Sequence, residues 1–402
     1  MALRTTDSHG WSVPTRRRPL VDMVDPLGSK RMRDELTAST WSYERNHSVK
    51  VLSVVGARPQ FVKLGPIARE FAAAGDIEHV IVHTGQHYDA AMSDVFFEDL
   101  GIPAPDVHLG VGSGSHGVQT GAMLSSLDAV LDEHRPDWTL VYGDTNSTIA
   151  AALAAVKMHL PVAHLEAGLR SFNRRMPEEH NRVLTDHAAD LLLPPTEVAM
   201  AHLAREGLAD RAILVGDVMT DVCFRTRDAV RDLPADLPDG VDPESAYVVA
   251  TIHRADNTDD PGRLTEIIAA LRDIEVPVVL LAHPRLVVRA NAFGIDLSGG
   301  SLHTTSPFAY PQMVRAVMGS AGVVTDSGGL QKEAFLLRAP CTTLRTETEW
   351  VESLDDGWNV LDADLTRVRQ CAVRPQPDMR QRQPYGDGHA AARVVAALRG
   401  VE

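Results

Sequence analysis

The sequence is poor in cysteine and has no long apolar run. Its three cysteines in 402 residues, Cys223, Cys341 and Cys371, are scattered and form no CxxC pair. Such spacing supports no disulfide framework and is typical of a reducing compartment, so it predicts a cytoplasmic protein. No apolar run reaches the ~18 residues of a membrane-spanning helix, and we therefore expect no membrane partner.

Several catalytic signatures are also missing. The sequence contains no HExxH, GxSxG or Walker A motif, and its histidines lack metal-ligand spacing. A metal, a nicotinamide cofactor and a serine nucleophile therefore have no support, and we expect none of them. The net charge of -15 argues against nucleic acid as a partner. An anionic small ligand stays possible, because a local group of arginines can override the mean charge.

The pattern of the chain predicts two similar α/β domains. Residues 1–48 show no strand or helix period and are predicted to be a disordered tail. Short apolar runs then alternate with helical patterns, which is typical of parallel sheets covered on both faces. The runs are 49–56, 79–85, 138–144, 160–168, 190–195 and 212–217, followed by 246–253, 276–283, 322–326 and 341–344. A linker rich in Pro and Asp, 231–245, separates the two series. We therefore predict Rossmann-like domains over 49–230 and 231–385, and a final helix in 386–402.

Ligands of such sheets bind beyond the carboxyl ends of the strands. The strongest local signal there is "VTDSGGLQKEA" (324–334), in which a strand, a Ser-Gly-Gly turn and a helix follow one another. Ser327, Gly328 and Gly329 predict a phosphate site, because a helix N-terminus offers free N–H groups and a positive dipole end. Glu333 lies further along the helix, where a carboxylate can hold ribose hydroxyls. An ordinary helix cap is the alternative interpretation.

Two further strand ends carry cations. In "VVGARPQFVK" (54–63), Arg58 and Lys63 are suited to neutralise a diphosphate, with surface charge as the alternative. In "ATIHRAD" (250–256), His253 and Arg254 follow a buried strand and suit a pyrophosphate or a developing leaving-group charge. A structural histidine is the alternative there.

Carboxylates follow three other segments. Asp144 and Glu166 each come directly after an apolar strand, and Glu178 and Glu179 open a helix behind Pro177. A helix cap explains Asp144, and the helix dipole explains the pair at 178–179. Taken together, the carboxylates predict a cluster that moves protons.

The chain from about 49 to 400 resembles the non-hydrolysing UDP-N-acetylglucosamine 2-epimerases. The resemblance lies in "GARPQFVK", "TGQHYD", "YGDTNST", "EAGLRS", "MPEEHNR", "VGDVMTD", "HRADN", "TDSGGLQKEA", "RTETEW" and "PYGDGHAAARV", which are ordered and spread over both domains. It implies a GT-B architecture, two Rossmann-like domains around a cleft with the last helix returning to the first domain. It also implies a homodimer and a UDP-sugar substrate.

The resemblance further implies the reaction and the roles of residues. The family expels UDP to give a 2-acetamidoglucal and re-adds it with protonation from the other face, without metal or cofactor. On this basis the acid and base candidates are Asp144, Glu166 and Glu178, and His253 assists the departure of UDP. Substrate-binding roles are implied for Arg58, Lys63, Gln86, His87, Arg170, Arg254, Ser327, Gly328, Gly329 and Glu333.

Two departures from the family pattern bear on specificity. Ala255 stands where enzymes activated by their own substrate carry a second arginine, which speaks against such activation. Several motifs, "SFNRRMPEE" and "TEWVE" among them, are closer to relatives that epimerise UDP-2,3-diacetamido-2,3-dideoxyglucuronate. The extra carboxylate of that sugar can be met by Arg170, Arg174 or Arg175. A hydrolysing 2-epimerase, a GT-B glycosyltransferase and a silent UDP-sugar-binding regulator remain alternatives.

Overall fold

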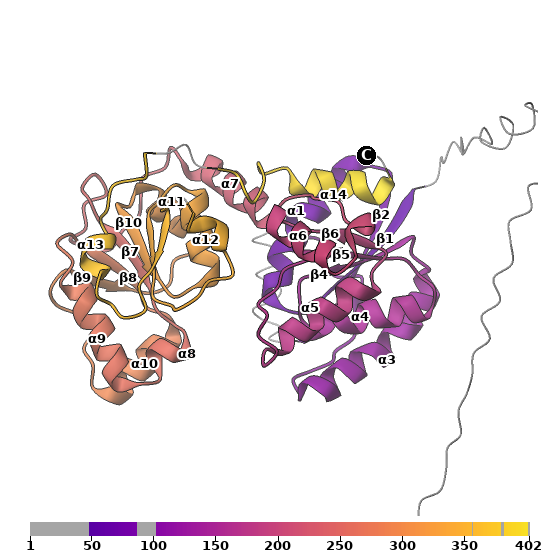
Figure 1. Ribbon diagram of the computed structural model, residues 1–402, viewed down its shortest axis with the longest axis horizontal. Helices are drawn as coiled ribbons and strands as arrows, with labels where there is room; N and C mark the ends of the chain where they lie inside the picture. Colours follow the sequence, from indigo (N-terminus) through magenta and orange to yellow (C-terminus); the bar gives the residue numbers. More distant parts are fainter. Residues whose placement is uncertain (1–47, 87–101, 356, 379–381, 401–402) are drawn as a thin grey trace, which may run out of the picture. The chain divides into compact units, whose positions relative to one another are not determined.

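The computed structural model describes residues 48–86, 102–355, 357–378 and 382–400 (Figure 1). Residues 1–47 of the predicted tail, and His87, lie outside these residues. The strands are β1 (Val49–Val55), β2 (Ile77–His83), β3 (Val107–His108), β4 (Trp138–Tyr142), β5 (Val162–Leu165), β6 (Leu191–Leu193), β7 (Val248–Thr251), β8 (Val278–Leu281), β9 (Leu302–Thr305), β10 (Gly322–Thr325), β11 (Cys341–Thr343) and β12 (Asn359–Leu361). The helices are α1 (Arg58–Ala74), α3 (His116–His134), α4 (Asn146–Lys157), α5 (Pro177–Ala188), α6 (Glu197–Arg205), α7 (Val218–Val230), α8 (Ala255–Thr258), α9 (Pro261–Arg272), α10 (Pro284–Phe293), α11 (Tyr310–Gly319), α12 (Gly328–Leu336), α13 (Val368–Cys371) and α14 (Ala390–Arg399), with 3-10 turns η1 (Ala209–Arg211) and η2 (Val351–Ser353).

Each half of the chain folds around its own parallel sheet. The first sheet has the order β3-β2-β1-β4-β5-β6, and the second has β12-β11-β10-β7-β8-β9. Both are the doubly wound order of a Rossmann domain, since the chain starts at a central strand, winds outward and then crosses to the other side. We call the parts built on these sheets the N-terminal lobe and the C-terminal lobe. The prediction of an α/β fold with two Rossmann-like domains is confirmed.

The N-terminal sheet is buried on both faces because its strands are almost uniformly apolar. On one face, Val51 and Leu140 pack with α1, the start of α7 and α14. On the other face, Leu52 and Val141 pack with α3, α4 and α6. The carboxyl ends of its strands are therefore the edge of this sheet where polar side chains become accessible.

Two helices depart from a simple repeat of strand and helix. Helix α14, yellow in Figure 1, lies against α1 although more than 300 residues of chain separate them. Trp138 at the start of β4 fastens it, since the indole nitrogen donates to the carbonyl of Leu398 over 3.0 Å. Helix α7 joins the two lobes, because Val218 belongs to the N-terminal core and Cys223 to the C-terminal core.

The structure differs from the expected strands in identifiable places. The run 212–217 forms no strand: Ala212 makes an isolated bridge to Leu192, and the following residues run as extended chain. Conversely, the short strands β3, β9 and β12 escaped prediction, because they lie at sheet edges and carry polar residues such as His303. No helix of the described part of the chain is both long and apolar enough to cross a membrane.

Candidate functional site

A lysine and a glutamate meet at the carboxyl end of the N-terminal sheet. Lys63 of α1 forms an ion pair with Glu166, the residue after β5; the Glu166 side chain is buried and that of Lys63 is 13% exposed. Burial alone lowers the pKa of Lys63, but the attraction of Glu166 outweighs it and raises that pKa. Gly143 packs closely against the pair: a Cβ at this position would lie 3.3 Å from both Lys63 Nζ and Glu166 Oε2. The pair therefore holds a cation and a carboxylate in contact, with glycine leaving room beside them.

Asp144 lies next to this pair. It follows Gly143 at the end of β4 and adds to the attraction on Lys63. Its carboxylate also forms an ion pair with Arg182 Nη2 over 2.6 Å. The structure thus brings Asp144 and Glu166 together with Lys63, which the sequence associated with Arg58 and a diphosphate and not with these carboxylates.

The two glutamates of α5 have different surroundings. Glu179 is buried and accepts hydrogen bonds from the backbone N–H groups of Ser171 and Phe172 at 2.8 and 2.9 Å. It therefore fastens the loop that follows Glu166. Glu178 is partly exposed and, among the described residues, enters no ion pair. Its carboxylate is the one that this helix leaves available.

Arg170 has surroundings that do not agree with its predicted role. Its guanidinium is almost completely buried, pairs with Asp186 Oδ2 over 2.7 Å and grips both oxygens of Glu206 over 2.8 Å. These carboxylates use the donors that a substrate carboxylate would need. Arg170 therefore has a structural role, in which it links Asp186 to Glu206. Arg174 and Arg175, by contrast, are exposed on the same loop.

Gln86 also has a bracing contact. Its side-chain oxygen accepts from the backbone N–H and the hydroxyl of Ser147 over 3.1 and 2.7 Å, which fixes the first turn of α4. Arg58 is the first residue of α1, one turn before Lys63.

A buried aspartate organises the strand ends of the C-terminal lobe. Asp326, the residue after β10, accepts from the backbone N–H groups of His253 and Arg254 over 3.1 and 2.9 Å. His253 Nδ1 lies 3.2 Å from the same carboxylate. Burial alone raises the pKa of Asp326, but His253 and the backbone bonds outweigh it and lower that pKa. The carboxylate therefore stays ionised, and its hydrogen bonds fix the orientation of the His253–Arg254 turn.

The predicted phosphate turn caps α12. Ser327 is the N-cap, and its hydroxyl accepts from the backbone N–H of Leu330 over 3.4 Å. The first N–H groups of a helix, here those of Gly328 and Gly329, have no acceptor within the helix. The space beside Gly328 is occupied by a carboxylate: a Cβ on Gly328 would come within 2.2 Å of Glu349 Oε1, and Glu349 pairs with Arg345 over 2.9 Å.

Glu333 lies further along α12, where burial raises its pKa to about 7. Its neighbour Lys332 is 4% exposed, forms an ion pair with Asp217 and lies 4.0 Å from the centre of the Trp350 ring. Asp217 is the N-cap of α7, so this pair ties α12 to the helix that joins the lobes.

Sequence reasoning missed the residues whose contacts support the predicted site residues. Asp326 was noted only as a strand end, and Lys332 and Asp217 stood inside motifs without a role of their own. Arg182 is the last residue of "MPEEHNR", and its charge beside two glutamates was the available signal. All four act through tertiary contacts that a sequence pattern does not specify.

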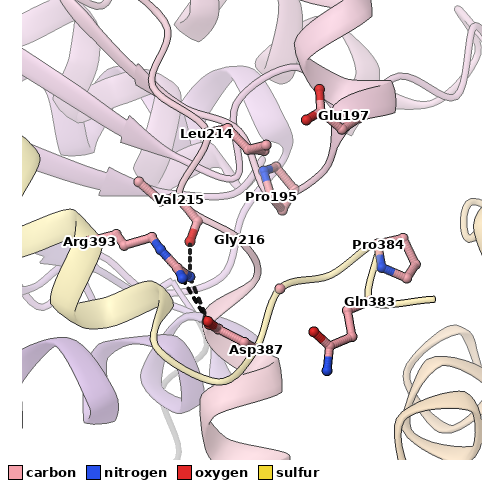
Figure 2. A pocket seen from close by; sticks show the side chains of 10 residues that line it. Pro195, Glu197, Leu214, Val215, Gly216, Gln383, Pro384, Asp387 and Arg393 are labelled. Atoms are coloured by element: carbon pink, nitrogen blue, oxygen red, sulfur yellow. Dashed lines mark hydrogen bonds and ion pairs between the residues drawn. The ribbon is translucent and has the colours of Figure 1, made fainter. Parts of the chain in front are cut away.

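A pocket of about 310 Å³ lies where the chain enters α7 and α14 (Figure 2). Figure 2 shows Arg393 of α14 directed at Asp387, with which it forms an ion pair over 2.8 Å. Pro195 and Pro384 line it from two further segments. None of the predicted site residues is among the described residues that line this pocket, so we do not assign the reaction to it.

The fold and these strand ends define a two-lobed Rossmann protein of the GT-B class. Residues 69–399 match the family model described as UDP-N-acetylglucosamine 2-epimerase, and the chain belongs to this family.

Relatives support this membership over most of the chain. The sequence is 44% identical over 363 residues to the UDP-2,3-diacetamido-2,3-dideoxy-D-glucuronate 2-epimerase of Pseudomonas aeruginosa, covering 87% of this chain and 99% of that protein. It is 36% identical over 363 residues to a UDP-N-acetylglucosamine 2-epimerase of Methanococcus maripaludis, covering 87% and 98%. The crystal structure of the Methanocaldococcus jannaschii UDP-GlcNAc 2-epimerase with UDP-GlcNAc and UDP is similar with a TM-score of 0.73 at 36% identity, covering 88% of this chain and all of that one. The resemblance stated from the motifs is thereby confirmed.

Proposed function

We propose that this protein is a non-hydrolysing UDP-N-acetylglucosamine 2-epimerase, which inverts C2 to give UDP-N-acetylmannosamine. The observation that carries the proposal is the Lys63–Glu166 ion pair beside Asp144 at the strand ends. A cation next to two carboxylates suits a reaction that both removes and delivers a proton. The named activities of the relatives support the same reaction.

The chemistry assigns work to each lobe. The C2 proton is not acidic by itself, so UDP leaves first, C2 then loses its proton to give a 2-acetamidoglucal, and re-addition of UDP with protonation from the other face completes the inversion. Asp144, Glu166 and Glu178 are the proposed acid and base groups. His253, held by Asp326, is the proposed aid to the departure of UDP.

The nucleotide is proposed to bind at the C-terminal lobe. The N–H groups of Gly328 and Gly329, with Ser327, suit the diphosphate, and Glu333 suits the ribose hydroxyls. Arg58 and Arg254 are proposed to complete the neutralisation of the diphosphate, and Lys63 to lie on the sugar side.

One observation favours a second substrate, UDP-2,3-diacetamido-2,3-dideoxyglucuronate. The relative named for that sugar is 44% identical to this chain, compared with 36% for the Methanococcus maripaludis UDP-N-acetylglucosamine 2-epimerase. With Arg170 engaged by Asp186 and Glu206, Arg174 and Arg175 remain as candidates for its carboxylate. We also propose, from the family resemblance and the scattered cysteines, a homodimer in the cytoplasm.

Proton NMR in D2O with each UDP-sugar tests the proposal. Loss of the C2 proton of UDP-N-acetylglucosamine, with the UDP-N-acetylmannosamine signal growing and no free UDP accumulating, is the expected result. Reaction of the diacetamido-uronate alone would replace the substrate and keep the reaction. Free N-acetylmannosamine with UDP would instead indicate a hydrolysing epimerase. No exchange with either sugar would contradict the proposal and favour a transferase or a silent binder.

A further inference from the structure

A histidine in the middle of β5 has an acceptor at each ring nitrogen. His164 is fully buried. Its Nε2 lies 2.7 Å from the carbonyl oxygen of Gly143, and its Nδ1 lies 2.6 Å from Asp186 Oδ1. A carbonyl oxygen only accepts hydrogen bonds, so Nε2 must carry a proton.

The second nitrogen faces an ionised carboxylate. Asp186 Oδ2 accepts from the backbone N–H of Gly168 over 3.0 Å and pairs with Arg170 over 2.7 Å. Burial alone raises the pKa of Asp186, but the attraction of His164 and Arg170 outweighs it and lowers that pKa. An ionised carboxylate has no proton to donate, so Nδ1 must donate to Oδ1 as well. His164 is therefore an imidazolium.

The two hydrogen-bonded turns carry the proposed acid and base groups. Gly143 immediately precedes Asp144, and Gly168 follows two residues after Glu166. Glu166 has a φ of 69°, in the left-handed region that is unfavourable for a residue with a Cβ. Such a conformation persists only where its surroundings over-determine it. The bonds from His164 and Asp186 supply that constraint on both sides.

We propose that His164 and Asp186 form a positioning pair, which sets the spacing between Asp144 and Glu166 for proton transfer at C2. The proposal rests on the proposed epimerase function. Neither residue touches the substrate; the pair acts through the backbone of the Gly143 and Gly168 turns. An imidazolium suits this task because it donates in two directions at once, whereas a neutral imidazole donates in only one.

Nitrogen-15 NMR of the whole protein, labelled in histidine, tests the protonation without any substrate. His164 should show two protonated ring nitrogens at pH 7. His79 is an internal reference in the same sheet, because burial lowers its pKa to about 4 and leaves it neutral. Two protonated nitrogens at His164, and one at His79, support the proposal. A bare ring nitrogen at His164 would overturn it.

Three variants test the positioning. In D186N the amide oxygen can accept from Gly168 and Arg170 while the amide nitrogen donates to a neutral His164, which preserves both turns. We expect D186N to keep kcat within about 10-fold, because alignment rather than charge is the requirement. In H164L both donors are lost, and we expect kcat to fall about 100-fold or more, in the range attributed to misplaced proton-transfer groups. H79L, which removes a half-buried histidine remote from the strand ends, is the matched control.

Comparing the effects on kcat and on KM separates a positioning role from a general loss of structure. H164L should leave KM and the affinity for UDP within about threefold, since the nucleotide is proposed to bind at the other lobe. H164Q, which keeps a donor toward Gly143, should recover part of kcat if H164L folds poorly. Equal kcat in H164L and wild type, or a loss of UDP affinity matching the loss of kcat, would overturn the proposal. A wild-type protein that exchanges no C2 proton would instead contradict the proposed function.

Discussion

Lys63 and Glu166 pair across the carboxyl edge of the N-terminal sheet, one from a helix and one from the residue after a strand. Glu166 keeps Lys63 charged, because its attraction outweighs the effect of burial and raises the pKa of the lysine. The pair therefore presents an ionised carboxylate and a cation to whatever lies beyond the strand ends. The first prediction therefore concerns the carboxylate of Glu166.

Glu166→Gln should abolish exchange at C2 while sparing nucleotide binding. Gln keeps the size of Glu but cannot take a proton, so we expect the rate of C2 exchange in D2O to fall by about 100-fold or more. The affinity for UDP, measured by calorimetry, should stay within about threefold. Glu78→Gln on β2, whose carboxylate is half exposed, is the matched control. Exchange at the normal rate in E166Q would remove Glu166 from the proton-transfer step.

Asp326 and His253 should behave as one unit. In D326N one end of the side chain becomes a donor facing the N–H groups of His253 and Arg254, so the turn should no longer be held in its orientation. We expect kcat to fall about 10-fold or more in D326N and in H253A. The double variant should be little worse than either, because coupled groups are not additive. Fully additive losses in the double-mutant cycle would show that the two residues act separately.

The residues that end strands could be predicted because a parallel sheet brings all carboxyl ends to one edge. This reasoning placed Asp144 and Glu166 at neighbouring strand ends, and its alternative interpretation of Ser327, a helix cap, is what the structure shows at α12. Motif and topology were sufficient there, since each residue is within a few positions of a strand or helix end.

The same reasoning failed for Arg170 because sequence proximity does not specify a tertiary partner. Arg170 follows Glu166 closely, yet Asp186 and Glu206 take up its guanidinium from 16 and 36 residues further on. His164 illustrates the converse. It reads as one polar residue in an apolar strand, and only the packing of α5 against β5 reveals its partner, Asp186.

The buried Lys332–Asp217 pair should contribute strongly to stability only as a pair. Removing one partner leaves the other charge buried and alone, which typically costs about 3–5 kcal/mol. We therefore expect K332M and D217N each to lower the free energy of unfolding by about that amount in urea titrations. The double variant K332M/D217N should recover most of the loss. Arg231, which pairs with Asp228 at the exposed surface, provides the control R231M, with a change below about 1 kcal/mol.

Substrate affinity should depend on pH through Glu333. Burial raises the pKa of this carboxyl to about 7, so it is mostly protonated at pH 6 and mostly ionised at pH 8. The ionised form accepts two hydroxyl hydrogen bonds and the protonated form offers a competing donor, so ribose binding should strengthen as pH rises. We expect the Kd of UDP-N-acetylglucosamine, whose esterified diphosphate does not titrate in this range, to fall by several-fold between pH 6 and 8. In E333Q the Kd should be larger than in the wild type and should not change with pH between 6 and 8. An unchanged pH dependence in E333Q would assign the titration to another group and leave Glu333 without a role in ribose binding.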